Sequence, residues 1–227
     1  MRFNNFLNRL RASGIYTLIA TTALTLILLV VVLLRALFYV EPPQSVFEAY
    51  VDNLQAQNFY SAERLITADQ RQQWNGVFAE YGGDESAEGS LRLALWKQAR
   101  WEMVSQSSLA EDHQTVRFLI SAPDAEAILA SVREAAESGA IDMGDPDVVR
   151  VARDAESTLL YYAEDHLDDN KHLLVQEEIV ISFHLNRNFI DRAWQLEPSQ
   201  ELHALLAGYL PDAMAKVFST PLDLPKS

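Results

Sequence analysis

The stretch "EIVISFHLNRNFIDRAWQL", residues 178–196, has the pattern of a β-hairpin. Every second residue of its first half is apolar, and residues 186–188 supply the polar turn. The apolar side consists of Ile179, Ile181, Phe183 and Leu185, and the returning strand adds Ile190, Trp194 and Leu196. This alternation predicts an antiparallel sheet with one buried face.

An earlier segment repeats this pattern. Residues 115–122 alternate with period two, and residues 101–109 form a less regular partner joined to them through residues 110–114. Residues 124–170, between the two hairpins, have helical spacing instead. The sequence therefore predicts two hairpins of one sheet, separated by a helical insertion.

Helices are expected before and after the strands in the sequence. Apolar residues recur every three or four positions over residues 44–57, and shorter helices are expected at 58–66 and 67–80. Residues 82–89 are rich in glycine and acidic residues, which predicts a loop. A final helix is expected near 199–208.

This order of elements resembles a known superfamily. The opening "PPQSVFEAYVDNLQAQNFYSAERLI", residues 42–66, and the later "VRFLISAPD", residues 116–124, are similar to the NTF2-like (cystatin-like) superfamily. More narrowly, they resemble uncharacterised membrane-anchored exported domains of Gram-positive bacteria. The resemblance covers residues 43–197. It implies an α+β cone, in which N-terminal helices pack on a curved antiparallel sheet and leave a pocket at the wide end.

The N-terminal region carries a long apolar run. Residues 15–34 contain no side chain that is charged at neutral pH and would reach about 30 Å as a helix, the thickness of the hydrocarbon core of a bilayer. Basic residues precede this run and acidic residues follow it, which places the N-terminus in the cytoplasm. We therefore expect a cytoplasmic tail over 1–14, a transmembrane signal anchor in the bilayer over 15–40, and an extracytoplasmic domain over 41–227. A cleaved signal peptide is the alternative.

Composition excludes several classes of function. Residues 41–227 hold 14 basic residues against 32 acidic ones, a formal charge of −18, which argues against nucleic acid as a partner. The chain has no cysteine, so disulfides, thiolate metal sites and cysteine nucleophiles are excluded. An exported domain without cysteine suits a bacterial source.

Two acidic segments are weak candidates for a metal site. In "EDHLDDNKH", residues 164–172, helical spacing brings together the oxygen and nitrogen ligands Asp165, Asp168, Asp169 and His172. In "DMGDPD" the candidates are Asp142, Asp145 and Asp147. A solvated helix end explains the first segment better than a metal site does, and a helix cap explains the second, so we expect no metal and no cofactor.

The sequence contains no catalytic signature, such as a nucleophile elbow, a phosphate-binding glycine loop or a His-Glu-x-x-His motif. Large aromatic residues could line a ligand pocket or fill the core. The pocket candidates are Tyr50, Trp74, Trp101, Phe118, Phe183 and Trp194. No catalytic residue can be assigned.

These observations predict a membrane-anchored, non-catalytic binding domain for a partner protein or a small apolar ligand. Homo-oligomerisation through an exposed sheet face is a further expectation. Two alternatives stay open: an enzyme of the isomerase or dehydratase type that the resemblance allows, and a structural docking subunit of a membrane complex that uses the insertion at 124–170. A carboxylate of raised pKa in a polar pocket would favour the enzyme.

Overall fold

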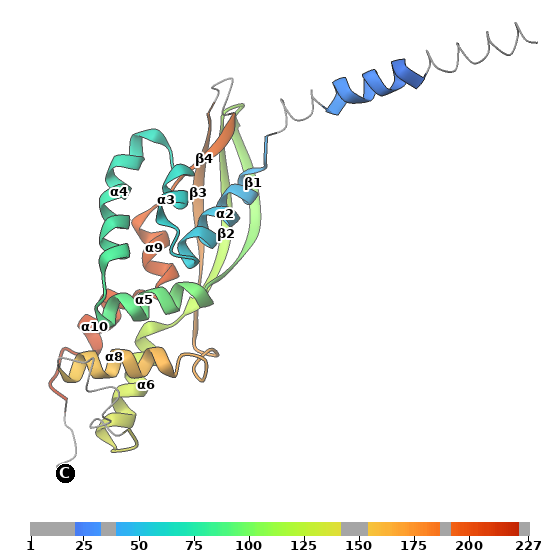
Figure 1. Ribbon diagram of the computed structural model, residues 1–227. Coiled ribbons are helices and arrows are strands. Elements are labelled where there is room, and N and C mark those ends of the chain that lie inside the picture. Colours follow the sequence, from blue (N-terminus) through green and yellow to red (C-terminus); the bar gives the residue numbers. More distant parts are fainter. Residues whose placement is uncertain (1–20, 33–39, 142–153, 187–191, 223–227) are drawn as a thin grey trace, which may run out of the picture. The chain divides into compact units, whose positions relative to one another are not determined.

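The computed structural model describes residues 21–32, 40–141, 154–186 and 192–222 (Figure 1). The chain divides into two compact units, residues 1–40 and 41–227. The described part of the first unit is a helix over residues 21–32. All strands and the remaining helices belong to the second unit, which is an α+β domain.

The predicted transmembrane anchor over 15–40 is wrong. Among the residues that the structure describes, no helix is long and apolar enough to cross a membrane. The signal anchor and the single-pass, extracytoplasmic placement of the domain depended on this span and are corrected with it. Residues 1–20 and 33–39 lie outside the described residues.

The sheet consists of two antiparallel hairpins. Strand β1 (Arg100–Ala110) pairs with β2 (His113–Pro123), and β3 (Leu174–Asn186) pairs with β4 (Ala193–Glu197). Strands β2 and β3 join the hairpins, so that the order across the sheet is β1-β2-β3-β4. Helices α6 (Ala125–Glu137) and α8 (Ala155–Asp165) lie between β2 and β3 in the sequence. The helical insertion between two hairpins is therefore present, although residues 142–153 lie outside the described residues.

One face of the sheet forms the core of the domain. Helices α2 (Pro43–Gln55), α5 (Ala87–Gln98) and α9 (Gln200–Leu206) contact this face. The Phe47 ring of α2 stacks on the Phe118 ring of β2, with centroids 4.0 Å apart. The side chains buried on this face include Val116, Phe118, Ile120, Ile181, Phe183 and Leu196. Period-two alternation thus predicted the buried face correctly.

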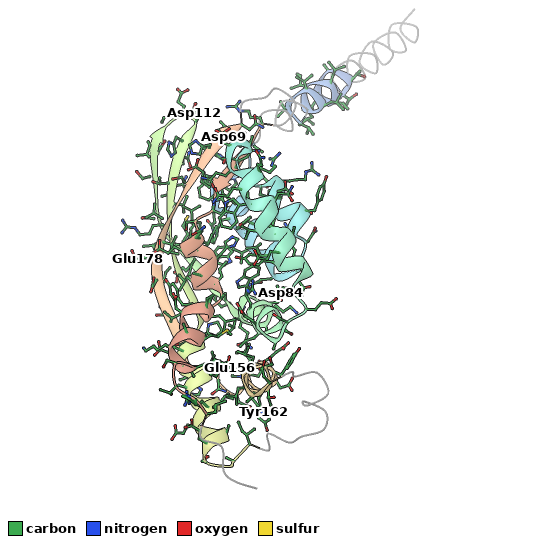
Figure 2. The ribbon with its side chains drawn as sticks, turned by 90° about the vertical axis from the view of Figure 1, so that its left-hand side faces the viewer. Asp69, Asp84, Asp112, Glu156, Tyr162 and Glu178 are labelled. Carbon is green, nitrogen blue, oxygen red and sulfur yellow. The ribbon has the colours of Figure 1, made fainter. Side chains whose placement is uncertain are left out.

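The opposite face of the sheet is exposed. Val180 on β3 leaves 56% of its surface accessible, and Arg117 pairs with Glu178 across the strands at 3.3 Å. Figure 2 shows Glu178 on the side of the sheet away from the helices. The strands therefore bury one face only, as expected of antiparallel hairpins.

The remaining helices of the described residues are one pair that follows α2 and one helix that follows α9. Helices α3 (Phe59–Arg64) and α4 (Ala68–Gly83) follow α2, whereas α10 (Leu210–Val217) follows α9 and packs on α6. The loop predicted over 82–89 is present but shorter, because α4 extends to Gly83 and α5 begins at Ala87, which leaves only residues 84–86 outside the helices. Ser86 caps α5 by accepting a hydrogen bond from the Gly89 amide at 3.1 Å.

Candidate functional site

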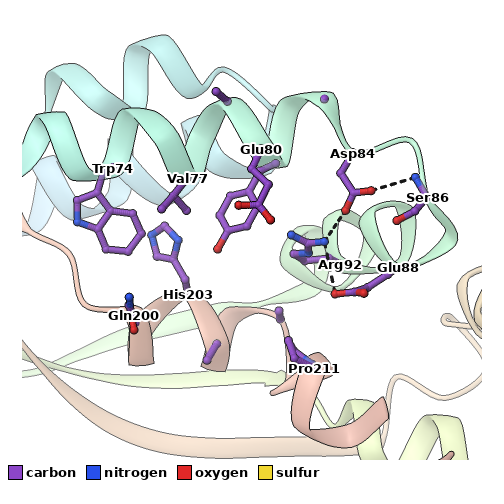
Figure 3. Close-up of a pocket in the computed structure, with 15 residues that line it drawn as sticks. Trp74, Val77, Glu80, Asp84, Ser86, Glu88, Arg92, Gln200, His203 and Pro211 are labelled. Carbon is purple, nitrogen blue, oxygen red and sulfur yellow. Dashed lines mark hydrogen bonds and ion pairs between the residues drawn. The ribbon is translucent and has the colours of Figure 1, made fainter. Parts of the chain in front are cut away.

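A pocket of about 880 Å³ lies between helices α4, α5, α9 and α10 (Figure 3). The faces of α4 and α9 that line it follow helical spacing, since each contributes residues three or four positions apart. The lining from α4 includes Trp74, Val77, Glu80 and Tyr81, and that from α9 comprises Gln200, His203 and Ala204, followed by Ala207 at its C-cap. Several lining residues are exposed, so the pocket opens to solvent.

His203 lies at the inner wall of this pocket. It is 3% exposed, and its Nε2 atom lies 2.7 Å from the hydroxyl of Tyr50, a buried residue of α2. Aromatic rings surround it: Trp74 is nearest, with ring centroids 4.3 Å apart, and Trp96 lies at 5.8 Å. The site therefore contains one polar pair within an aromatic environment.

The protonation of this pair follows from its burial. Burial lowers the pKa of His203 to about 3, so that the imidazole is neutral at physiological pH. Burial, and then the neighbouring Tyr81, raise the pKa of Tyr50, which keeps its hydroxyl protonated. Among the described residues the hydroxyl has no other hydrogen-bond partner, so we assign it as the donor to Nε2 of His203, the arrangement that leaves fewer polar groups unpaired. The imidazole hydrogen then lies on Nδ1.

Nδ1 of His203 is buried and has no hydrogen-bond partner in the described part of the chain. A buried donor without an acceptor costs about 1–3 kcal/mol, and most buried polar groups in proteins avoid this cost. His203 also lines the pocket, so this unpartnered nitrogen belongs to a residue of the pocket wall. This donor is the most specific chemical feature of the site.

Charged residues form the other end of the pocket, as Figure 3 shows. Arg92 of α5 lies 2.6 Å from Asp84 and 3.6 Å from Glu88, and its guanidinium stacks on the Tyr81 ring with Cζ 4.9 Å from the centroid. Only 12% of the Arg92 side chain is exposed. Partners on several sides therefore hold the guanidinium in place.

Two pKa shifts describe the electrostatics of this end. Burial raises the pKa of Asp84, but hydrogen bonds from Ser86 and the charge of Arg92 outweigh it, so the net pKa lies below its usual range. Burial raises the pKa of Tyr81, Arg92 opposes that shift, and the charge of Glu80 adds to it. Asp84 is therefore ionised at neutral pH. The negative charge of Glu80 disfavours deprotonation of the Tyr81 hydroxyl.

The pocket candidates from the sequence lie in different places. Trp74 lines the pocket, and Tyr50 lies behind His203 as its hydrogen-bond partner. Phe118 and Phe183 are fully buried against the sheet, as is most of Trp194. Trp101 packs edge-on against Phe47, with ring centroids 5.5 Å apart. The structure thus brings two of the six candidates to this site.

The metal-site candidates are dispersed. Asp168 accepts a hydrogen bond from Gln98 at 3.2 Å, and Asp169 lies 3.1 Å from the His166 ring. Asp165 ends helix α8, and His172 is exposed. In the four described stretches, no three histidine or acidic side chains converge in a way that could hold a metal ion. Asp142, Asp145 and Asp147 lie outside the described residues.

The structure also joins two histidines on the exposed sheet face. His113 of β2 pairs in register with His184 of β3, and their ring centroids are 4.3 Å apart. Nε2 of His184 lies 3.1 Å from Glu197. This cluster lies away from the pocket and lacks the convergence that a metal site needs.

Sequence reasoning missed most of the pocket. The missed residues include Glu80, Tyr81, Asp84, Glu88, Arg92, Gln200 and His203. One signal was available: His203 stands among Leu202, Leu205 and Leu206, on what is otherwise an apolar helix face. A histidine on such a face needs a buried partner, which the sequence could not name. The comparisons add no identity, since no family model, curated protein or solved structure matches the chain.

Proposed function

We propose that residues 41–227 form a non-catalytic binding domain, whose pocket holds a small, largely apolar ligand that carries a hydrogen-bond acceptor. The observation that carries this proposal is the unpartnered Nδ1 of His203, a buried atom in a residue that lines the pocket. Ligand pockets commonly combine an apolar lining with a few well-placed polar groups. Here Trp74 supplies an aromatic wall, and a hydrogen bond from the Nδ1–H group of His203 orients the ligand.

The chemistry of the polar residues supports binding over catalysis. A histidine with a pKa of about 3 is a weak base, and at neutral pH it is not in the imidazolium form that acts as a general acid. The pKa of Asp84 is lowered, whereas a catalytic acid of the isomerase type needs a raised one. Binding uses His203 in its stable neutral form. The NTF2-like relationship and homo-oligomerisation stay predictions beside this proposal.

Binding of benzamide to the full chain tests the proposal. Benzamide has an aromatic ring that can pack on Trp74 and a carbonyl oxygen that can accept from His203. His203→Phe retains a ring of similar size and removes the donor, so we expect the dissociation constant of benzamide to rise about tenfold. Ligand-observed NMR measures this constant even when binding is weak.

The matched control is Tyr50→Phe. It breaks the same interior hydrogen bond but leaves the imidazole of His203 in place, so we expect benzamide affinity within about threefold of that of the wild type. Circular dichroism would show whether both variants remain folded. A wild-type chain that does not bind benzamide, or an equal loss of affinity in both folded variants, would contradict the proposal.

A further inference from the structure

We propose that the ligand also carries a positive charge, an organic ammonium group, which the carboxylate of Glu80 holds in the same pocket. This inference rests on the proposed function, because it assigns a second contact to the ligand of His203. The pocket then recognises two groups at once: an acceptor at the aromatic end and a cation toward the charged end.

The charge of the pocket favours a cation. Three carboxylates line it, Glu80, Asp84 and Glu88, against the single guanidinium of Arg92. An anionic ligand would face like charges there, which costs free energy. The whole chain has a net charge of −14, which also attracts cations toward its surface.

Arg92 is not available to an anion. Its guanidinium is paired with Asp84 at 2.6 Å and lies over the Tyr81 ring, and its side chain is 12% exposed. An anionic group would have to break the pair with Asp84 before it could bind. Arg92 therefore fixes the position of Asp84 and forms part of the pocket wall.

Glu80 is the carboxylate that remains for a ligand. It is exposed, and it forms no ion pair with any residue of the described stretches. Glu80, His203 and Asp84 line the same pocket, and in the view of Figure 3 Glu80 lies between the other two. Glu80 therefore places a negative charge in the wall of the pocket, between its aromatic end and its charged end.

Aromatic rings add to the attraction. Trp74 and Tyr81 line the pocket on either side of Glu80 in helix α4, and ring faces attract ammonium groups through their quadrupoles. Tyr81 already binds one cation in this way, since Arg92 lies over its ring. A carboxylate beside aromatic rings is a suitable site for an organic cation.

A pair of probes tests this inference on the full chain. The probes are 4-methylbenzamide, which is neutral, and 4-(aminomethyl)benzamide, which has the same amide and ring with an added ammonium group. We expect the wild type to bind the ammonium probe about fivefold more tightly than the neutral one. In Glu80→Gln this advantage is lost, whereas affinity for the neutral probe is unchanged.

Glu48→Gln is the matched control, because it removes the same charge from an exposed position of α2 outside the pocket. It is expected to retain the fivefold advantage. If the neutral probe binds but the ammonium adds nothing, or if Glu80→Gln retains the advantage, this inference is overturned and the proposed function stands. If neither probe binds, both fail.

Discussion

At the scale of single residues, His203 is the most unusual group in the domain. It is buried among aromatic rings, its Nε2 is satisfied by Tyr50, and its Nδ1 has no partner in the described residues. Burial keeps it neutral, with a pKa of about 3. This residue makes the stability of the domain depend on pH. It is also the residue that we propose contacts the ligand.

His203 makes stability depend on pH in a defined window. An unfolded histidine has a pKa near 6.5 and takes up a proton as the pH falls, whereas folded His203 does not until about pH 3. The unfolded state therefore binds more protons between these values, so the free energy of unfolding decreases as the pH falls from 6.5. We expect His203 to account for a loss of about 2 kcal/mol between pH 7 and pH 5. Urea denaturation at both pH values measures this loss.

The comparison uses two variants. His203→Gln cannot titrate, so it should lose about 2 kcal/mol less than the wild type over this interval. His172→Gln changes an exposed histidine and should lose as much as the wild type. Asp84, whose pKa is lowered, is present in all three proteins and cancels from the comparison. Equal pH dependence in His203→Gln and the wild type would mean that His203 is not buried as a neutral group.

At the scale of elements, the start of α5 shapes the charged end of the pocket. Asp84 folds back over Gly89: it accepts a hydrogen bond from the Ser86 amide at 3.1 Å and pairs with Arg92. A Cβ at position 89 would lie 2.5 Å from the backbone oxygen of Asp84 and 2.5 Å from its Cγ. Glycine at this position therefore lets the turn and the ion pair form together.

Two glycine substitutions should act in opposite directions. Gly89→Ala should lower the free energy of unfolding by about 2 kcal/mol, because the added methyl group displaces Asp84. Gly76→Ala, within α4, meets no atom within 4 Å and should raise the free energy of unfolding by about 0.5–1 kcal/mol. Urea denaturation of the two variants checks both signs. Stabilisation by Gly89→Ala would show that Asp84 does not lie against α5.

The elements differ in how well the sequence predicts them. The hairpins were predictable because a sheet with one buried face needs strict alternation, as between buried Ile181 and exposed Val180. Helix α5 was not, since its first turn, Ala-Glu-Gly-Ser, has the composition of a loop. The Ser86 cap and the packing of Asp84 against Gly89 make that turn helical. Both depend on contacts that form only in the folded chain.

At the scale of the whole molecule, the sequence predicted the sheet but not the pocket. The pocket was expected among aromatic residues near the sheet, such as Phe118 and Phe183, but these rings are fully buried in the core. It lies instead between helices α4, α5, α9 and α10, which come together from distant parts of the sequence. Hydropathy also predicted a membrane span near the N-terminus, whereas no helix of the described residues is long and apolar enough to cross a membrane.

The measurement that tests the account most directly is nitrogen NMR of the His203 imidazole in the full chain, with and without benzamide. We expect a neutral ring with its hydrogen on Nδ1 from pH 7 to pH 5, and a shift of the Nδ1 resonance when benzamide binds. The other four histidines should not respond to benzamide. A His203 ring that titrates near pH 6.5, or an Nδ1 resonance unchanged by saturating benzamide, would contradict the account.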